Sequence, residues 1–381
     1  MKVPRVGHSR PYICHNCRTS HTPASRQNFS FTSTSKLRHP PPSPVAAYTR
    51  LNTRRLVAIT GPDCVDFLHG VVTQNLHPKE PRTTGFYTAF LNPQGRLLND
   101  VFIYPYKGNG GTGMEGQEGY LIEVDAKQVE IFAKLINRYK LRAKLKARII
   151  EPSEAAIWSV WGADSLEDTP SITACADTRA PGMGARLILP GGKTPDVDLE
   201  ETGEESYRIR RYLRGVPEGQ DELGRESALP QESNVDYMGG IDYRKGCYVG
   251  QELTIRTHHT GVVRKRILPI MLYGVDEQMP ESLEYEPNKE LGVEGRPPAG
   301  TGIGRFEKRG RSAGKFVAGV GNIGLGLCRL EVMTDIRLGP ESVGYKVDDE
   351  FTLEWTVEGD KSEMVKVKAF VPPFFPLNKE I

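Results

Sequence analysis

A change of sequence texture near residue 265 constrains the fold more than any other feature of this chain. Up to that point, apolar runs of strand length alternate with stretches whose apolar residues follow a helical period. Beyond it, runs such as "RKRILPIMLYG" and "SAGKFVAGVGNIGLGLCRLE" are short, β-type and broken by Gly and Pro. At 381 residues the chain also exceeds the size at which one hydrophobic core keeps growing. We therefore predict α+β units followed by a small all-β barrel or sandwich.

The first α+β unit is predicted over residues 46–150. "RLVAITGPDCVDFLHGVVTQN" contains a strand followed by a helix start signal, and the Asn-Pro-Gln-Gly turn in "FYTAFLNPQGRLLNDVFIYPY" indicates a hairpin. "YLIEVDA" is strand-like, and "KLRAKLKARII" alternates apolar with basic residues, which predicts a strand with one solvated face. The helix predicted between them, over residues 127–138, has an inward face of Val129, Ile131, Phe132, Leu135 and Ile136.

A second, similar unit is predicted over residues 151–265. "AAIWSVWG" and "GARLILP" have the composition of strands, and a helix is predicted over residues 205–214. Strands followed by amphipathic helices and returning strands are typical of split βαβ, ferredoxin-like sandwiches. The barrel then comprises residues 266–381.

Residues 1–45 have the composition of an organellar transit peptide that ends in a Pro-rich linker. They contain many Ser and Thr and no acid, and the first carboxylate of the chain is Asp63. Seven of the 50 Lys and Arg residues lie in this segment, which leaves 43 against 48 acidic residues. We therefore expect no nucleic-acid partner, a basic nucleic-acid-binding arm being the alternative. No apolar run approaches the roughly 18 residues of a membrane span.

The six cysteines point to a reducing compartment such as the mitochondrial matrix. Cys14 and Cys17 form a CxxC with His15 and His21 nearby, which suggests zinc, but no second ligand pair follows at finger spacing. A chain of this size does not need disulfides, and the other four cysteines are scattered singly. They are Cys64, Cys175, Cys247 and Cys328.

"RKGCYVGQELTIRTHHTG", residues 244–261, holds the candidate site chemistry. Cys247 has three interpretations that stay open: a reactive thiol, a metal ligand, or a small core-filling residue. Its thiolate is favoured by Arg244, by Lys245 and by the N-terminus of a helix predicted to begin near Gly250.

The end of that predicted helix carries two histidines. His258 and His259 lie roughly 17 Å along a helix from Cys247, too far for a Cys-His catalytic dyad. We predict that they are structural or face a partner. Arg256, which has the i,i+4 spacing of an ion pair with Glu252, is predicted to face a partner with them.

Two further charged segments have alternatives that spacing does not decide. Asp100 follows the hairpin turn, where an aspartate is often a turn or cap residue, but a carboxylate facing a pocket also binds a protonated ligand nitrogen. "GVVRKR", residues 261–266, is either a charged lead-in to the barrel or a clamp for phosphate or polyglutamate.

"KGCYVGQE" resembles the signature K-G-C-Y-x-G-Q-E of the YgfZ proteins. These are a branch of the folate-binding superfamily that includes the aminomethyltransferase, or T protein, of the glycine cleavage system. "ITGPDCVDFLHGVVTQN", "LNPQGRLLND", "RRYLRGVP" and "LPQES" are similar to further superfamily motifs in the same order. The signature residues here are Lys245, Gly246, Cys247, Tyr248, Gly250, Gln251 and Glu252.

The resemblance implies an aminomethyltransferase-like architecture: two ferredoxin-like α/β units and a C-terminal β-barrel. In the folate enzymes, a pocket aspartate and a glutamate of the second domain hold tetrahydrofolate, and Asp100 and Glu232 occupy the matching positions. Arg211 falls at the arginine of a second-domain motif. The aminomethyltransferases lack the cysteine signature, so its presence here disfavours one-carbon transfer.

The leader and "THHTGVVRKR" are similar to those of the eukaryotic mitochondrial members, which act late in iron-sulfur cluster assembly. The resemblance thus implies an assembly factor of the mitochondrial matrix rather than an enzyme. It would work with A-type scaffold proteins to mature [4Fe-4S] clients, aconitase-like or radical-SAM enzymes such as lipoyl synthase. Cys247 would be a ligand of a transient [2Fe-2S] cluster shared with the partner. The alternatives are a tetrahydrofolate-dependent aminomethyl transferase and a structural chaperone with Cys247 buried.

Overall fold

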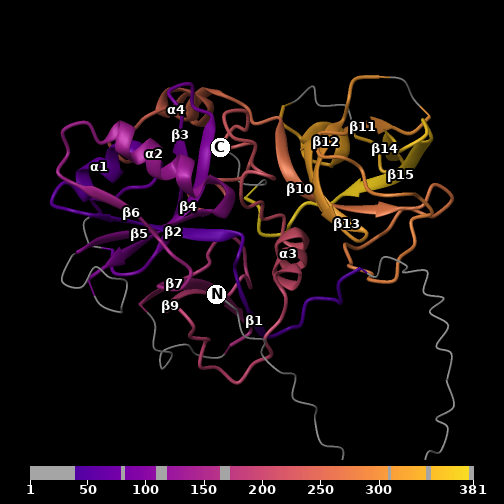
Figure 1. Cartoon of the computed structure of the whole chain (residues 1–381). Helices are drawn as coiled ribbons and strands as arrows, with labels where there is room; N and C mark the ends of the chain where they lie inside the picture. Colours follow the sequence, from indigo (N-terminus) through magenta and orange to yellow (C-terminus); the bar gives the residue numbers. More distant parts are fainter. Residues whose placement is uncertain are drawn as a thin grey trace, which may run out of the picture. The chain divides into compact units, whose positions relative to one another are not determined.

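A computed structural model of the chain describes residues 39–78, 82–108, 118–163, 172–307, 310–339 and 345–376. Within these residues the chain forms a five-stranded sheet, a four-stranded sheet and a closed six-stranded barrel (Figure 1). The predicted order of α+β structure followed by a barrel is therefore confirmed. The strands are β1 (Ala47–Arg50), β2 (Arg54–Thr60), β3 (Phe86–Leu91), β4 (Leu97–Tyr106), β5 (Gly119–Asp125), β6 (Lys146–Ile150), β7 (Ala155–Trp161), β8 (Thr173–Ala176), β9 (Ala185–Pro190), β10 (Lys265–Tyr273), β11 (Gly302–Arg305), β12 (Gly314–Val320), β13 (Ile323–Arg329), β14 (Phe351–Thr356) and β15 (Ser362–Ala369). The helices are α1 (Cys64–Val71), α2 (Val129–Tyr139), α3 (Glu204–Leu213), α4 (Gln251–Thr260) and α5 (Leu330–Met333), with a 3₁₀ turn at Ala126–Gln128.

Most of the predicted transit peptide, with Cys14 and Cys17, lies outside the described residues. The description begins at His39, just before the Pro-rich linker. Among the helices of the described ranges, none has the length and apolarity needed to cross a bilayer.

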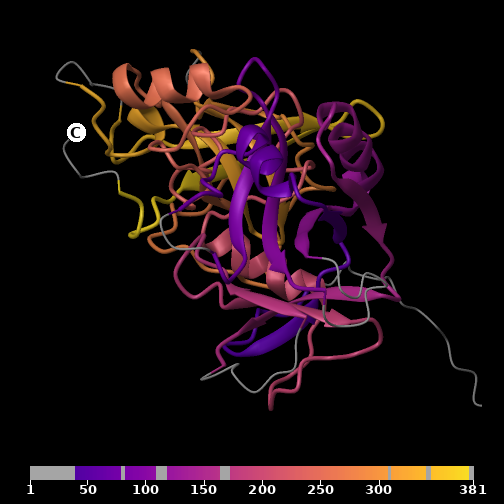
Figure 2. The same cartoon turned by 90° about the vertical axis from the view of Figure 1, so that its left-hand side faces the viewer.

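The first sheet has the strand order β3-β4-β5-β2-β6, and its neighbouring strands are antiparallel. Successive side chains of a strand point to opposite faces, so Val57 and Ile59 lie on one face, and Leu56 and Ala58 on the other. Helices α1 and α2 cover the face of Val57, where Phe132 of α2 is fully buried (Figure 1 and Figure 2). The opposite face packs against residues of the second sheet.

Two details of the first unit correct the sequence analysis. The helical period places Ile131 on the inward face of α2, but its side chain is 46% exposed because Phe132 and Ile136 occupy the buried stripe. The alternation of apolar and basic residues in "KLRAKLKARII", residues 140–150, predicts a strand from residue 140, but β6 begins only at Lys146. Leu141 lies in the tight turn after α2, exposed and with a φ of 43°, because the chain must reverse direction there.

The second sheet has the order β1-β7-β9-β8, and its first strand comes from the start of the folded body. β1 pairs antiparallel with β7, with Ala47 opposite Trp161. The chain thus gives its first strand to the second sheet and its next strand, β2, to the first. Ile157 and Ile188 face the first sheet, and α3, which follows β9, contacts β12 and β13 of the barrel.

The barrel closes because β10 pairs on one side with β13 and on the other with β15. The remaining strands complete the order β10-β13-β12-β11-β14-β15. Its interior is apolar, with Leu268, Ile303, Leu353 and Val365 fully buried. Closure removes the open strand edges that invite pairing with other chains.

The Pro-rich stretch before β1 is tied to both the barrel and the second sheet. The Tyr285 hydroxyl, in the loop after β10, donates to the Pro40 carbonyl at 2.6 Å. The indole nitrogen of Trp161, at the end of β7, donates to the Pro44 carbonyl at 2.9 Å. We call residues 39–44 the linker strap, because these contacts hold the barrel loop and the second sheet to one short segment.

Removal of residues 1–46 is expected to destabilise the protein relative to removal of residues 1–38. The longer truncation deletes both carbonyl acceptors and leaves the Trp161 indole donor unpaired. An unsatisfied buried donor costs about 1–3 kcal/mol, so we expect the free energy of unfolding to fall by roughly 2–4 kcal/mol. Urea unfolding of the two proteins measures this difference. Tyr285→Phe in the protein that begins at residue 39 isolates the contact with the barrel loop. Equal stability of the two truncations would show that the strap contributes nothing.

Candidate functional site

Cys247 lies on an exposed loop directly before α4. Its neighbour Gly246 is exposed with it, as is Glu252 in the first turn of the helix. Helix α4 begins at Gln251, as the sequence predicts, and its N-cap is Gly250. The signature therefore presents its thiol to solvent, and the core-filling interpretation of Cys247 is wrong.

The other cysteines of the described ranges are buried. Burial, together with the Asp63 charge, raises the pKa of Cys64 to about 11. Burial likewise raises the pKa of Cys175 to about 12 and raises that of Cys328. Since the thiolate is the nucleophile and the metal ligand, these three thiols are unavailable near neutral pH. Within the described part of the chain, Cys247 is the thiol that solvent and partners can reach.

Lys245 anchors the loop to the C-terminal end of α1. Its ammonium donates to the carbonyl of His69 and, at 2.7 Å, to that of Val72, and it lies 4.6 Å from the centre of the Tyr248 ring. The last carbonyls of a helix lack intrahelical partners and carry partial negative charge, which favours a cation there. Burial lowers the pKa of Lys245 to about 8, although Asp242 and Cys247 oppose the shift. A charge that titrates near neutral pH therefore acts on Cys247.

Two glycines bring the signature against the hairpin turn between β3 and β4. Gly250 has a φ of 79°, and a Cβ there would lie 2.2 Å from the Asn92 carbonyl oxygen. Gly95 has a φ of 77°, and a Cβ there would lie 3.0 Å from the Gly250 carbonyl oxygen. Residues with a side chain rarely adopt this backbone conformation, so both positions require glycine. The Gln251 side chain accepts from the Tyr248 backbone nitrogen at 3.2 Å, which fixes the start of α4.

His69 is a residue of this site that the sequence analysis did not identify. A Cβ on Gly246 would lie 3.4 Å from its Nε2. Its Nδ1 accepts from the Leu76 backbone nitrogen at 3.3 Å, so the neutral ring carries its proton on Nε2, beside the loop. Burial and the Lys245 charge lower the pKa of His69, which favours the neutral ring. No sequence signal links α1 to the distant signature.

Helix α4 presents the residues predicted to face a partner. Arg256, His258 and His259 are exposed in its second half. The His258 ring stacks on Tyr243, with centroids 3.6 Å apart and planes 9° from parallel. Cys247 precedes the helix, and His258 and His259 lie about 10–12 Å along the axis from its first residue, Gln251. The structure therefore does not bring them together as a Cys-His dyad.

Asp100 is fully buried in β4 and paired within the chain. Its carboxylate forms an ion pair with Arg54 at 3.2 Å. It also accepts a hydrogen bond from the Gly219 backbone nitrogen at 3.1 Å and one from the Gln220 side chain at 3.3 Å. Asp100 is therefore not a turn or cap residue, and its carboxylate is occupied by protein donors.

Arg211 and Glu232, the other two folate-pocket candidates, also have partners in the chain. Arg211 of α3 forms a bidentate ion pair with Glu222, at 2.8 and 2.9 Å. Glu232 contacts Lys265 at 3.1 Å, where the chain approaches β10. Glu218 contacts Arg211, and the next residue, Gly219, contacts Asp100. Arg211 and Asp100 therefore lie in one cluster. Glu232 lies apart from it, beside the barrel.

A cluster of buried charges joins the first sheet, the second sheet and α3. Arg186 of β9 contacts Glu123 of β5, Glu218 and the Tyr207 hydroxyl. Glu123 also pairs with Arg54 at 2.8 Å. We call this the buried charge cluster; its members are Arg54, Asp100, Glu123, Asp177, Arg179, Arg186, Tyr207, Arg211 and Glu218.

The arginines keep the carboxylates of this cluster ionised. Burial disfavours the charge on Glu218, but Arg186, Arg179 and Arg211 outweigh it and hold the pKa of that carboxyl well below its usual range. Asp177 has its pKa lowered in the same way, burial being outweighed by Arg179 and Arg186. The sequence carried a signal for part of the cluster, because a charge interrupts the apolar strands "YLIEVDA" and "GARLILP".

The residues matched to the folate enzymes do not form a free ligand site. Asp100 and Arg211 would have to leave Arg54 and Glu222 to bind a folate, and Glu232 lies elsewhere. Among the described residues, no three His, Cys, Asp or Glu side chains are placed to hold a metal ion together.

Comparison with known proteins identifies close relatives over most of the chain. A protein of Pyricularia oryzae named "Iron-sulfur cluster assembly factor IBA57 homolog, mitochondrial" is 52% identical over 337 residues, which cover 86% of this chain and 84% of that protein. A protein of the same name from Coccidioides immitis is 45% identical over 388 residues, or 95% and 90% of the two chains. Residues 264–377 match the family described as "CAF17, C-terminal beta-barrel domain".

The fold also has a solved counterpart. The crystal structure of glycine cleavage system aminomethyltransferase T from Bartonella henselae superposes with a TM-score of 0.58 and covers 87% of each chain. At 12% sequence identity, this likeness concerns the fold alone. The predicted aminomethyltransferase-like architecture is confirmed.

Replacement of Glu218 by Gln is expected to lower the free energy of unfolding at pH 7 by about 3–5 kcal/mol, because it removes one carboxylate that the buried Arg179 and Arg186 share and leaves the cluster with excess positive charge. Glu218 has a depressed pKa, so its contribution is present above about pH 4.3, its unfolded value, and is lost as the pH falls. The difference from wild type should therefore shrink from pH 7 to about pH 3.5. Urea unfolding at both pH values tests this, with exposed Glu354→Gln as the control; a difference independent of pH would contradict it.

Replacement of Lys245 by Gln is expected to slow alkylation of Cys247 by iodoacetamide below about pH 8 and to leave it unchanged above. Lys245 is charged below its pKa of about 8 and neutral above it. A positive charge near a cysteine promotes nucleophilic attack by its sulfur. One nearby charge in a largely aqueous path changes the rate roughly threefold. Peptide mass spectrometry follows Cys247 specifically, and exposed Lys315→Gln is the control. An equal change at every pH would give Lys245 a purely structural role.

Proposed function

This chain belongs to the IBA57 family of mitochondrial iron-sulfur cluster assembly factors, and we propose that its Cys247 thiolate is one ligand of a [2Fe-2S] cluster shared with a partner protein. The partner is an A-type scaffold protein, itself rich in cysteine, which supplies the remaining ligands. The encounter takes place in the mitochondrial matrix. The cluster is cargo: it passes onward to [4Fe-4S] clients of the aconitase-like and radical-SAM, lipoyl synthase type.

The observation that carries this proposal is the exposure of Cys247 on an anchored loop. Its neighbours hold the backbone through Lys245, Gly250 and Gln251, so the thiol is presented without a flexible tether. Ligation releases the thiol proton, and the Lys245 ammonium of the same loop complements the negative charge of a thiolate-bound cluster. The Nε2–H group of His69 lies beside the loop. It is available to donate a hydrogen bond to a sulfur atom of a cluster bound at Cys247.

A single protein ligand also explains why the factor needs a partner. One thiolate leaves most of the iron coordination sites open, so the cluster is stable only while the scaffold's cysteines complete the set. Release then requires breaking one iron-sulfur bond on this side. An assembly factor of this kind stabilises a cluster during transfer rather than storing it.

Tetrahydrofolate-dependent aminomethyl transfer is the alternative function, and the fold favours it only by analogy. The paired state of Asp100 and Arg211 argues against it. Isothermal titration of the purified protein with tetrahydrofolate addresses this alternative directly. Binding that Asp100→Asn abolishes, in a protein that retains its unfolding transition, would favour the folate function.

Anaerobic mixing of the protein with an A-type scaffold that carries a [2Fe-2S] cluster is expected to give a coloured heterocomplex. Visible absorption and size exclusion should both detect it with wild type. Cys247→Ser should lose at least tenfold in yield, because one of the cluster ligands is gone. Cys64→Ala, which removes a buried thiol, is the matched control and should behave as wild type.

The same coloured complex with Cys247→Ser would contradict the shared-ligand proposal. The signature would then serve to shape a docking surface, as in the structural-chaperone alternative. A stable cluster on the isolated protein would also count against it, because one thiolate does not hold a cluster alone.

A further inference from the structure

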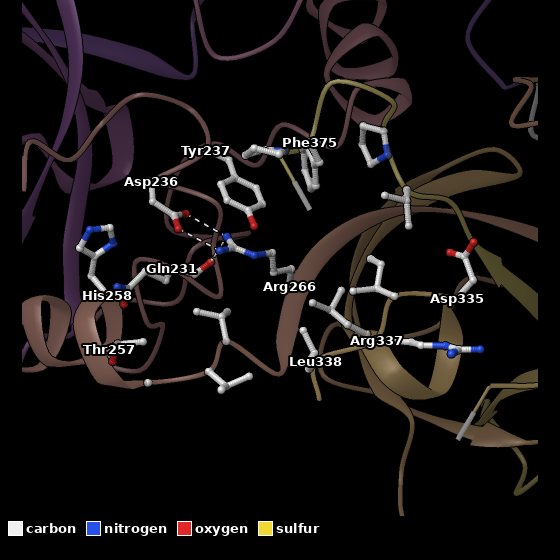
Figure 3. Close-up of a pocket in the computed structure, with 18 of the residues that line it drawn as sticks. Gln231, Asp236, Tyr237, Thr257, His258, Arg266, Asp335, Arg337, Leu338 and Phe375 are labelled. Atoms are coloured by element: carbon white, nitrogen blue, oxygen red, sulfur yellow. Dashed lines mark hydrogen bonds and ion pairs between the residues drawn. The ribbon is translucent and has the colours of Figure 1, made fainter. Parts of the chain in front are cut away.

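A groove of about 830 Å³ lies between the C-terminal end of α4 and the segments that surround the barrel. Figure 3 shows Thr257 and His258 on one side of it and Arg337 and Leu338 on the opposite side. The ion pair between Arg266 and Asp236 lies between the two sides (Figure 3). The site predictions from sequence included His258 but not this groove.

The base of the groove is rigid and electrically neutral. Arg266 forms a bidentate pair with Asp236, at 2.9 Å for both bonds, and donates to the Gln231 carbonyl at 2.7 Å. Its guanidinium lies 3.5 Å from the centre of the Tyr237 ring. Because Arg266 is buried and fully engaged, it shapes the groove rather than attracting a charged ligand. This also disfavours the phosphate or polyglutamate clamp at "GVVRKR", at least through Arg266.

One wall of the groove is apolar and reaches the surface. Leu338, Val371 and Phe375 line it, and Val262 lies at its mouth with 52% of its side chain exposed. Val262 is one of the few large apolar side chains that the described residues leave exposed. Apolar surface next to a concave groove of this size marks a binding site for an apolar side chain.

The rim of the groove is basic. Arg337 lines the groove and is exposed. Arg256 and Arg264 are exposed on the adjoining chain, next in sequence to the lining residues Thr257 and Val263. Two acidic residues line the groove: Asp236, which is paired with Arg266, and Asp335. The chain has no acid between Glu252 and Asp276, so α4 and the lead-in to the barrel form a continuous positive segment. A partner surface that complements it carries carboxylates.

The groove is continuous with the signature through α4. Cys247 lies four residues before the start of α4. A helix rises 1.5 Å per residue, so Thr257 and His258 lie about 10 Å along α4 from that start. A specific protein interface buries about 1,200–2,000 Å², far more than one cysteine provides. A partner that shares a cluster with Cys247 must therefore contact neighbouring surface, and α4 leads it to the groove.

We propose that the groove binds an extended acidic segment of the cluster-sharing partner. One apolar side chain of that segment packs against Val262, Leu338 and Phe375, and flanking carboxylates face Arg256, Arg264 and Arg337. The proposal rests on the proposed function for the identity of the partner. It adds that affinity comes mainly from the groove, whereas Cys247 determines whether the complex holds a cluster.

Binding of the full chain to the cluster-free A-type scaffold, measured by isothermal titration at two salt concentrations, tests this inference. Val262→Glu and Arg337→Glu are expected to raise Kd at least tenfold, and high salt should weaken wild-type binding more than binding of Arg337→Glu. At saturating cluster-loaded scaffold, both variants should still give the wild-type absorption spectrum. Exposed Val347→Glu and Arg142→Glu are matched controls.

Cys247→Ser separates the two proposals. It should bind the cluster-free scaffold as wild type does, yet form no coloured complex. If Val262→Glu and Arg337→Glu bind like their controls, the groove inference is wrong even where Cys247 proves to be a ligand. Concentration-dependent dimerisation of the chain alone that Val262→Glu abolishes would assign the groove to a second copy instead, and would also overturn it.

Discussion

Buried guanidinium groups and carboxylates face each other between the two sheets, and the arrangement of the whole α+β body depends on them. Arg186 reaches from the second sheet to Glu123 of the first, and Glu218, after α3, meets both Arg179 and Arg186. Ions taken out of water are costly unless each has a well-placed partner. The charge cluster is therefore satisfied in only one relative placement of the two sheets. Apolar packing alone would permit other placements, so the cluster makes the arrangement specific.

The same cluster shows why residues that resemble a folate pocket in sequence are not free to bind a ligand in the structure. The sequence resemblance matches Asp100 to the pocket aspartate of the folate enzymes, but Arg54 and the Gly219 amide occupy its oxygens. The exposed chemistry lies instead at the signature loop, on the side of α1 and α4. The fold thus separates a rigid, closed interior from an outer face where one thiol, basic residues and a groove follow a single helix.

Element order, the hairpin turn, the start of α4 and the barrel could be predicted from local patterns, because turn chemistry and periodicity are local. The edge of the buried face of α2 could not be predicted: Ile131 is as apolar as Phe132, and only packing on the sheet decides that Phe132 is buried and Ile131 is not. At the site, the signature located Cys247, whereas His69 and the Glu123–Arg186 contact arise from segments far apart in sequence. Glu123 and Arg186 stand out in the sequence as charges on otherwise apolar strands. The sequence does not show which residues they pair with.

The placement of β1 has a consequence for the order in which the molecule assembles. β1 leads the folded body, yet its neighbour β7 follows only after the entire first sheet, and the strap's Tyr285 contact comes later still. Non-local contacts of this kind form slowly, because a long loop must close first. Until then, β7 has an unpaired edge open to other strands. The contacts made by the start of the chain are therefore expected to be among the last to form.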